Sequence, residues 1–297
     1  MRKSNGELSV RDGNRKVGGP VAAEVHGTAK GWMGAAGQVV LLVHGFNNNF
    51  DEAQKAYLSF REHLPASGTW YLGEVQWPGD ADFGFVQWLD FLSYPTEIPD
   101  ARESAERLAA YLSQVARINP ALELTLVGHS LGCRLILEML GRFESGASKP
   151  APFIRRILLM AAAVPTALSE PGKRLQKAGA QARERLVLFS PDDIVLGLAF
   201  PAGQSLARLL KYEDHFYFEA VGLNGHPESF ASEKPLQACG NGHSDYWKDE
   251  DAASYLAQKM GAAVSNRLKE RCLPKHETPA ANELPSGTLH TYEIGSY

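Results

Sequence analysis

The sequence predicts an α/β fold with a mostly parallel central sheet and helices on both of its faces. Short apolar runs alternate along the chain with longer amphipathic segments, which is typical of β-α-β units. The run Val39–Val43 is apolar at every position, as expected of a strand that is covered on both faces. A second run, Leu122–Val127, leads directly into a glycine-flanked turn and a further apolar segment. In sheets of this kind, ligands bind at the carboxyl ends of the strands.

The N-terminal part of the chain is rich in Gly, Lys and Arg, and it fits an extension with one or two edge strands. In chain order, we expect this extension over residues 1–36, a strand at Val39–Val43, a helix at Asp51–Leu64 and a strand at Tyr71–Trp77. The segment 80–98 carries many aromatic residues without clear periodicity, so we expect it to lie irregularly over the top of the sheet. Asp100 and Glu103 form a capping-box pattern, which predicts that the next helix begins there.

The second half of the chain continues the alternation of strands and helices. We expect a strand at Ile154–Met160, a mixture of helix and loop at Pro165–Ala178, a strand at Arg185–Phe189, a loop at Ser190–Asp193, a short helix at Ser205–Leu210, a last strand at Phe216–Val221 and a helix at Trp247–Val264. The main domain therefore spans residues 37–267. Residues 268–297 are expected to form a loosely ordered tail, because Pro, Gly, Ser and Thr dominate from Leu273 onward.

Bulk composition excludes several classes of protein. The 297 residues are 44% hydrophobic, enough for one substantial core, and the net charge of −4 argues against nucleic acid or an anionic membrane surface as a partner. No apolar run reaches the roughly 18 residues of a spanning helix, so no stable membrane insertion is expected. The N-terminus lacks the apolar core of a secretory signal. Cys133, Cys239 and Cys272 are odd in number and scattered, which indicates reduced thiols, no metal site and a cytoplasmic protein. No cofactor is expected, and the oligomeric state is not predicted.

The motif that carries chemistry is Gly128-His129-Ser130-Leu131-Gly132, which has the pattern G-x-S-x-G between a strand and a helix. A turn of this kind holds its serine strained and exposed at the top of the sheet. A chance match in a glycine-containing loop is the alternative, and the strand before and the apolar helix after it make that reading much weaker. Ser130 is therefore the candidate nucleophile, and it needs a base, an orienting acid and donors for an oxyanion.

A second motif, His44-Gly45-Phe46, follows the strand Val39–Val43 directly. It places backbone N–H groups at the same end of the sheet as the nucleophile. We assign the oxyanion donors to the backbone N–H groups of Phe46 and Leu131. A plain Gly- and Asn-rich turn is the alternative. His44 itself is expected to be a structural hydrogen-bonding residue of this loop and not the base.

The sequence offers two candidates for the acid and two for the base that Ser130 needs. Asp192 and Asp193 both follow the strand Arg185–Phe189, and their spacing alone does not separate them. For the base, His226 and His243 both lie in loops after the expected last strand. His243 is favoured because a helix follows it closely and would hold its loop in place. Two surface histidines without a catalytic role remain the alternative.

With these residues in view, the chain resembles the serine esterases and lipases of the α/β-hydrolase fold, in which the triad also follows the order Ser, Asp, His. More narrowly, over roughly residues 37–267 it is similar to the DUF900 group of uncharacterised hydrolases. The matching segments are His44–Asn48, Trp77–Pro78, Gly128–Gly132, Ser190–Leu196 and Gly242–Tyr246. The resemblance implies Asp193 as the acid and His243 as the base. Gly79 departs from the family, where Ser is expected, and the two terminal extensions match nothing.

The function expected from these residues is hydrolysis of carboxylic esters through an acyl-serine intermediate. The substrate would be a small-molecule or lipid-like ester, and the aromatic residues between 83 and 94 would either line an apolar acyl pocket or pack in the core. A thioesterase, an amidase or a peptidase would use the same triad. A non-catalytic module that binds through the same fold is the alternative from another class.

Overall fold

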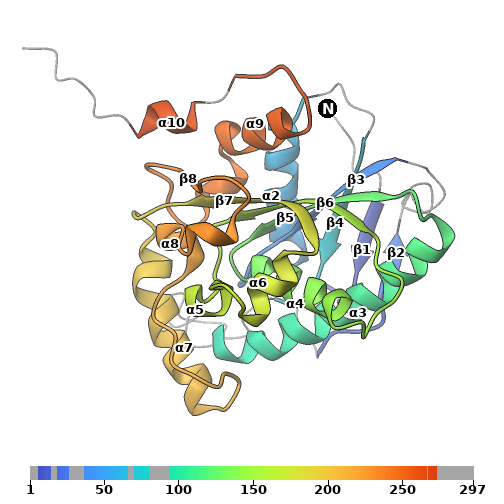
Figure 1. Ribbon diagram of the computed structural model, residues 1–297, viewed down its shortest axis with the longest axis horizontal. Helices are drawn as coiled ribbons and strands as arrows, with labels where there is room; N and C mark the ends of the chain where they lie inside the picture. The colour runs from blue at the N-terminus through green and yellow to red at the C-terminus, as the bar shows by residue number, and fades with distance from the viewer. Residues whose placement is uncertain are drawn as a thin grey trace, which may run out of the picture.

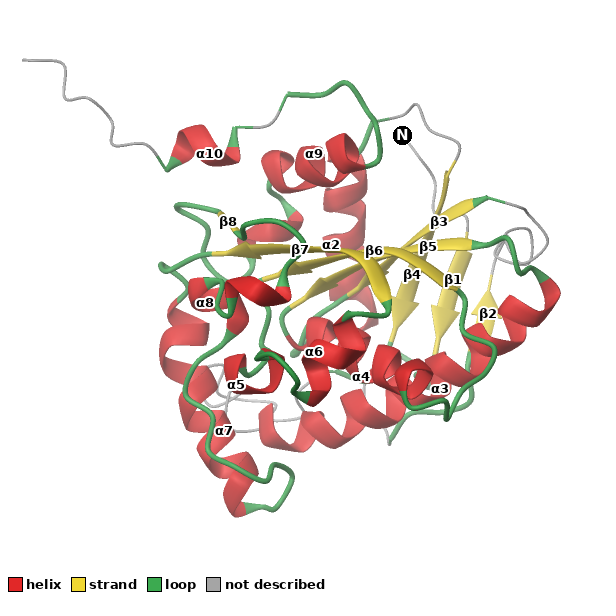
Figure 2. Cartoon of the chain, viewed as in Figure 1, coloured by secondary structure: helices red, strands yellow, loops and turns green. Residues whose placement is uncertain are grey.

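The computed structural model of the chain describes residues 6–14, 19–26, 37–65, 70–79, 94–265 and 267–272. Figure 1 shows one sheet that crosses the molecule, with helices on both of its faces. The helices α2 and α9 lie on one side of the sheet, and α3, α4 and α6 lie on the other (Figure 2). This arrangement of layers is that of an α/β-hydrolase fold, as the sequence predicts.

The sheet contains eight described strands in the order β2-β1-β4-β3-β5-β6-β7-β8. Their bounds are β1 Gly6–Ser9, β2 Glu24–His26, β3 Gln38–Val43, β4 Trp70–Gln76, β5 Glu123–His129, β6 Phe153–Met160, β7 Ala182–Phe189 and β8 Leu236–Gln237. Among these strands only β2 runs antiparallel to its neighbour. The two N-terminal strands extend the same sheet beyond β4, with β2 at its edge.

The helices are mostly short and follow the strands in alternation. Their bounds are α2 Phe50–His63, α3 Tyr94–Ile118, α4 Leu131–Glu144, α5 Thr166–Ser169, α6 Arg174–Gly179, the π-helix η3 Val195–Ala199, α7 Phe200–Leu209, α8 Val221–Asn224, the 3₁₀ turns η4 Glu228–Phe230 and η5 Asp245–Trp247, α9 Glu250–Lys259 and α10 Leu268–Arg271. Among the described residues, no helix has the length and apolar character needed to cross a membrane.

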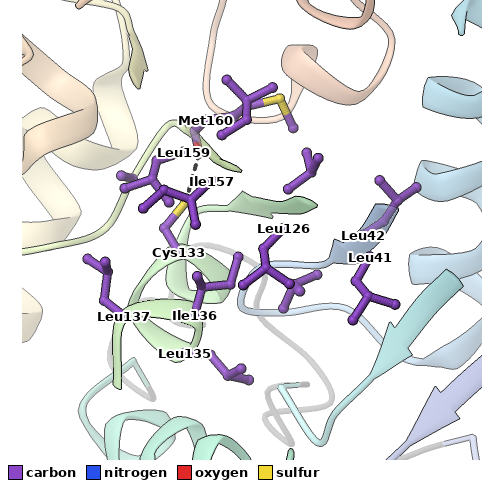
Figure 3. Packing of buried hydrophobic residues seen from close by; sticks show 14 of the residues in the cluster. Leu41, Leu42, Leu126, Cys133, Leu135, Ile136, Leu137, Ile157, Leu159 and Met160 are labelled. Carbon is purple, nitrogen blue, oxygen red and sulfur yellow. Dashed lines mark hydrogen bonds between the residues drawn. The ribbon is translucent and has the colours of Figure 1, made fainter. Parts of the chain in front are cut away.

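The core is formed where the central strands meet α4. Strand β3 is buried at five of its six positions, as its continuous apolar run predicts. Leu126 of β5 and Ile136 of α4 lie in one layer with Ile157 of β6 (Figure 3). The thiol of Cys133 donates to the carbonyl of Met160 at 3.5 Å, which joins the first turn of α4 to the end of β6 (Figure 3).

The helix expected to begin at Asp100 begins earlier, at Tyr94, so the predicted start is wrong. Pro99 lies inside the helix, within its first two turns, where a missing N–H removes only one hydrogen bond. Glu97 and Ile98 are both buried, so packing extends the helix beyond the capping pattern. Residues 94–98 are therefore helical and not irregular, and residues 80–93 lie outside the described part of the chain.

The expected last strand, Phe216–Val221, is also wrong. Its alternating aromatic residues suggest a strand, but Phe216 and Phe218 are 56% and 63% exposed. The sheet edge that this segment would join is occupied, because β7 pairs with β8 through Leu188 and Leu236. Only Ala220 forms an isolated bridge, and α8 then begins at Val221.

Two of the remaining helices differ from prediction in their bounds. The expected short helix at Ser205–Leu210 is the C-terminal half of α7, which begins at Phe200. The helix expected at Trp247–Val264 is divided: a 3₁₀ turn ends at Trp247, and α9 begins after Asp249. Asp249 caps α9, because its side chain accepts a hydrogen bond from the N–H of Asp251 at 2.9 Å.

The prediction that all three cysteines are reduced is wrong for two of them. Cys239 and Cys272 form a disulfide across a sequence separation of 33, with 5.3 Å between their Cα atoms. Packing of α10 beside β8 brings the two together, which their spacing in the sequence does not reveal. Cys133 is free and buried, and burial raises the pKa of its thiol. The expected cytoplasmic location rested in part on reduced thiols, and the disulfide removes that argument.

The central strand β6 provides a direct test of this core. Replacing the fully buried Leu158 with alanine is expected to lower the free energy of unfolding by about 2–5 kcal/mol, since a cavity remains where the side chain was. The same replacement at Leu209, which is 75% exposed, is the matched control and is expected to change it by less than about 0.5 kcal/mol. Urea unfolding measures both, and equal effects would contradict the placement of β6 in the core.

Candidate active site

Ser130 lies at the turn between β5 and α4, in a backbone conformation that residues other than glycine rarely adopt. Its φ is 52° and its ψ is −124°. The turn is held by the neighbouring strand, because the N–H of Ser130 donates to the carbonyl of Met160 at 3.0 Å. Its own carbonyl accepts from the N–H of Ala163 at 3.2 Å. The strain at Ser130 is therefore supported by the end of β6, and such strain is typical of functional turns.

The structure brings Ser130, His243 and Asp193 into one chain of hydrogen bonds. Nε2 of His243 lies 2.8 Å from Oγ of Ser130, and Nδ1 of the same ring lies 2.8 Å from Oδ2 of Asp193. The three residues come from loops that follow β5, β7 and β8 at the carboxyl edge of the sheet. An imidazole held between a hydroxyl and a carboxylate can accept a proton from the hydroxyl while the carboxylate stabilises its charged form.

The two aspartates that spacing left open occupy different positions. Asp193 is 1% exposed, and its second carboxylate oxygen accepts from the N–H of Leu196 at 3.0 Å. Asp192 is exposed, and its carboxylate accepts from the N–H of Gly240 at 3.3 Å. Only Asp193 lies against the imidazole of His243. The alternative base, His226, is exposed on another loop, where its N–H donates to the side chain of Asn224 at 3.0 Å.

The loop that follows β3 packs tightly against the serine turn. A Cβ at Gly45 would lie 2.8 Å from Cβ of Ser130, and one at Gly132 would lie 2.7 Å from the carbonyl oxygen of Val43. Side chains do not tolerate such distances, so both positions need glycine. This contact places the loop that carries Phe46 beside the N-terminus of α4, which begins at Leu131. The positive end of the helix dipole favours negative charge at this point.

His44 is buried and holds this loop in place. Its Nε2 accepts from the backbone N–H of Trp77 at 3.3 Å, and its Nδ1 lies 2.9 Å from the carbonyl oxygen of Gly45. The indole of Trp77 stacks on the imidazole and donates its Nε1–H to the carbonyl of His44 at 2.9 Å. Burial lowers the pKa of His44 to about 3, so the ring is neutral. These contacts are those of the structural residue that the sequence predicts.

His129 is a residue of the site that the sequence did not single out. Its Nε2 lies 2.6 Å from the backbone carbonyl oxygen of His243, and the two imidazole centroids are 5.1 Å apart. Burial lowers the pKa of His129 to about 3, so its ring is neutral and Nε2 donates its proton to that carbonyl. His129 therefore fixes the backbone of the residue that contacts Ser130. The sequence shows His129 within the serine motif, but it does not reveal the contact with His243, because that residue lies 114 positions further along the chain.

Ser130 and His243 open into a cavity of about 590 Å³. One wall is apolar and comes from η3 and the start of α7, with Val195, Leu196 and Phe200. Further lining residues come from α2 and the region of η5. A cavity of this size suits a small organic ligand. Among the described residues, no cluster of three or more His, Cys, Asp or Glu side chains is arranged to hold a metal ion.

Residues 31–215 match a family described as "Alpha/beta hydrolase of unknown function (DUF900)". The chain belongs to this family. Within this DUF900 protein the match contains the serine turn and the loop with Asp193, whereas His243 lies beyond its C-terminal limit. No curated protein matches the chain.

Several solved structures are similar to the DUF900 chain. A poly(3-hydroxybutyrate) depolymerase from Bordetella parapertussis is 14% identical, with a TM-score of 0.43 over 79% of this chain and 83% of that one. A thioesterase of prodiginine biosynthesis from Streptomyces coelicolor is 12% identical, with a TM-score of 0.41 over 74% and 85% of the two chains. An esterase from the archaeon Pyrobaculum calidifontis is 12% identical, with a TM-score of 0.40 over 78% and 74%.

The two buried histidines predict how the stability of this DUF900 protein depends on pH. Burial lowers the pKa values of His44 and His129 from 6.5 to about 3, so the unfolded chain binds protons that the folded chain does not. The free energy of unfolding is therefore expected to fall as pH falls below 6.5, approaching about 1.4 kcal/mol per pH unit for each histidine.

Urea unfolding between pH 7.5 and pH 4.5 measures this dependence. The His129→Asn variant removes one of the two protons taken up on unfolding, so its slope against pH should be roughly half that of the wild type. Each protein is compared with its own stability at pH 7.5. A flat profile in the wild type would contradict the neutral state of the two buried rings.

Proposed function

We propose that the protein is a serine hydrolase that cleaves carboxylic esters through an acyl-serine intermediate. The observation that carries this proposal is the hydrogen-bonded chain from Ser130 through His243 to Asp193, at the floor of a cavity. Membership of an α/β-hydrolase family supports the same chemistry. We further propose residues 37–267 as the catalytic domain, which includes every residue of this machinery.

In the first half-reaction, Oγ of Ser130 attacks the ester carbonyl carbon while Nε2 of His243 takes the hydroxyl proton. The carboxylate of Asp193 accepts from Nδ1–H and stabilises the imidazolium that forms. The tetrahedral intermediate then collapses, and the C–O bond to the alcohol breaks. The imidazolium donates its proton to the departing alcohol oxygen, which leaves an acyl group on Ser130.

In the second half-reaction, water takes the place of the alcohol. The neutral His243 removes a proton from water, and the resulting oxygen attacks the acyl carbon. Collapse of the second tetrahedral intermediate returns the proton to Oγ of Ser130 and releases the carboxylic acid. His129 supports both halves, since its bond to the backbone of His243 keeps the imidazole within reach of the serine.

For the oxyanion we propose the backbone N–H groups of Phe46 and Leu131. The close contact between the loop of Gly45 and the serine turn supports this choice, as does the start of α4 at Leu131. Preorganised donors of this kind contribute about 3–4 kcal/mol each to stabilisation of the transition state. Phe46 also lines the cavity, so a carbonyl bound next to Ser130 would lie close to its backbone.

A thioesterase, an amidase or a peptidase would use the same acyl-serine, so the leaving group has to be identified by experiment. A panel of oxygen esters, thioesters and amides that share one acyl group separates these activities. A purely binding module would need no imidazole between a serine and a buried carboxylate, and this argues for catalysis.

The Ser130→Ala variant is expected to lose at least about 10⁴-fold in kcat for short p-nitrophenyl esters, because it removes the nucleophile. Asp193→Asn should lower kcat by roughly the same factor, since an amide does not stabilise the charged imidazole. The exposed His226→Gln variant is the control and should keep the kcat of the wild type. An active Ser130→Ala variant would exclude this mechanism.

A phosphonate probe tests the nucleophile without a substrate. The folded wild type is expected to gain one covalent adduct on Ser130, which mass spectrometry of a peptide digest identifies. The Ser130→Ala variant should gain none. Labelling of another residue at the same rate in both proteins would assign the nucleophile elsewhere.

A further inference from the structure

The cavity next to Ser130 is lined by both charged and apolar side chains. Among its lining residues in the described chain, the Asp, Glu, Lys and Arg side chains are Glu52, Lys55 and Lys248, and we call these three the charged wall. The lining residues from η3 and the start of α7 are apolar. A ligand that fills this cavity would therefore meet both hydrocarbon and charge.

The single acid of the charged wall is already engaged. Oε2 of Glu52 accepts from the backbone N–H of Asn49 at 2.9 Å, as part of the capping box that begins α2. Lys55 and Lys248 are exposed, and neither makes an ion pair with any residue that the structure describes. Glu52 keeps its negative charge, and two lysines against one carboxylate give this wall a net positive charge.

The two lysines lie on neighbouring elements. Helix α2 packs against η5 through the rings of Tyr57 and Phe60, each of which meets Trp247 edge-on with 5.5 Å between centroids. Lys55 precedes Tyr57 by two residues on α2, and Lys248 directly follows Trp247. Lys55 and Lys248 therefore lie on two elements that pack together, and both side chains line the cavity.

We propose that the substrate is an anionic ester, with a carboxylate or phosphate group held between Lys55 and Lys248 and an apolar part along Val195, Leu196 and Phe200. This inference rests on the proposed hydrolase function and names its substrate class. The ammonium group of a lysine acts as a point charge, so it attracts a carboxylate and a phosphate alike. What the wall recognises is therefore the negative charge that the two groups share. Because both lysines are exposed, solvent and salt screen them, and each contributes about a three- to fivefold change in KM.

Matched esters test this substrate class. The p-nitrophenyl ester of butyric acid is the neutral probe, and the p-nitrophenyl monoester of glutaric acid adds a carboxylate. An acylated glycerol phosphate carries phosphate on the alcohol side instead, so it separates the two anions. At low salt the wild type should show a lower KM for an anionic ester than for its neutral counterpart, and about 0.5 M salt should remove most of that difference.

The Lys55→Met and Lys248→Met double variant should raise KM for the anionic ester about tenfold and leave the neutral ester unchanged. Lys177→Met, an exposed lysine of α6 away from the cavity, is the matched control. Equal KM changes for both esters, or no change for either, would overturn the substrate class. If the wild-type protein hydrolyses neither the anionic nor the neutral ester, the result would count against the hydrolase function itself.

An independent set of contacts concerns the loop that carries His243. Arg271 of α10 donates to Oδ2 of Asp249 at 2.8 Å and to the backbone carbonyl of Cys239 at 2.9 Å. The same guanidinium donates to the side chain of Asn241, which is buried and itself donates to Asp249 at 2.7 Å. These contacts hold both sides of His243, from Cys239 to Asp249.

The helix that carries Arg271 is itself anchored. Leu268 is fully buried, and the next residue after Arg271, Cys272, is bonded to Cys239. The N–H of Arg267 donates to the carboxylate of Asp251 at 3.0 Å. We infer that Arg271 is a positioning residue, which acts through Asn241 and Cys239 to keep the imidazole of His243 in line with Ser130.

Arg271→Ala tests this role. Arg267→Ala is the control, because Arg267 is the N-cap of the same helix and its side chain pairs with Asp251 of α9 and not with residues 239–249. Arg271→Ala should lower kcat on the neutral ester about tenfold with little change in KM, and it should slow phosphonate labelling by the same factor. Arg271→Lys should recover part of the loss. A lower Tm with wild-type kcat would show a structural role only and would overturn the inference.

Discussion

The site depends on one strained turn, the conformation of Ser130 between β5 and α4. Its positive φ persists because the backbone of the serine is bonded on both sides, to Met160 at the end of β6 and to Ala163 just beyond it. Those bonds continue the parallel pairing of β5 with β6, which reaches His129 and Met160. The hydrophobic layer beneath the turn therefore stabilises the serine in a conformation that an isolated chain would leave.

Around that turn, three more loops meet at the carboxyl edge of the sheet, and each brings one group. The loop after β3 brings Phe46, the loop after β7 brings Asp193, and the loop after β8 brings His243. Burial acts on this assembly in two ways. It makes the contact of Asp193 with the imidazole stronger than it would be in water, and it keeps His129 neutral, so that its ring can hold the backbone of the base.

Periodicity and local motifs predicted the central strands and the serine turn well, because both are short-range patterns. Val39–Val43 could be assigned from its apolar run, and Ser130 from five residues and their flanks. Patterns failed where packing competed with them. The capping box at Asp100 does not set the start of α3, because the buried Glu97 and Ile98 extend the helix. The aromatic alternation after Phe216 does not form a strand, because β8 occupies the sheet edge.

By itself, the sequence determined the parallel sheet, the elbow at Ser130 and a short set of candidates for its acid and base. Spacing left Asp192 and Asp193 open, and the family resemblance implied Asp193 and His243. The tertiary structure brings Asp193 and not Asp192 against His243, and it alone placed His129 behind that ring. It also decided the bond between Cys239 and Cys272. The physical reason is that local order follows from neighbouring residues, whereas these contacts join positions 30 to more than 100 residues apart and exist only once the whole core has packed.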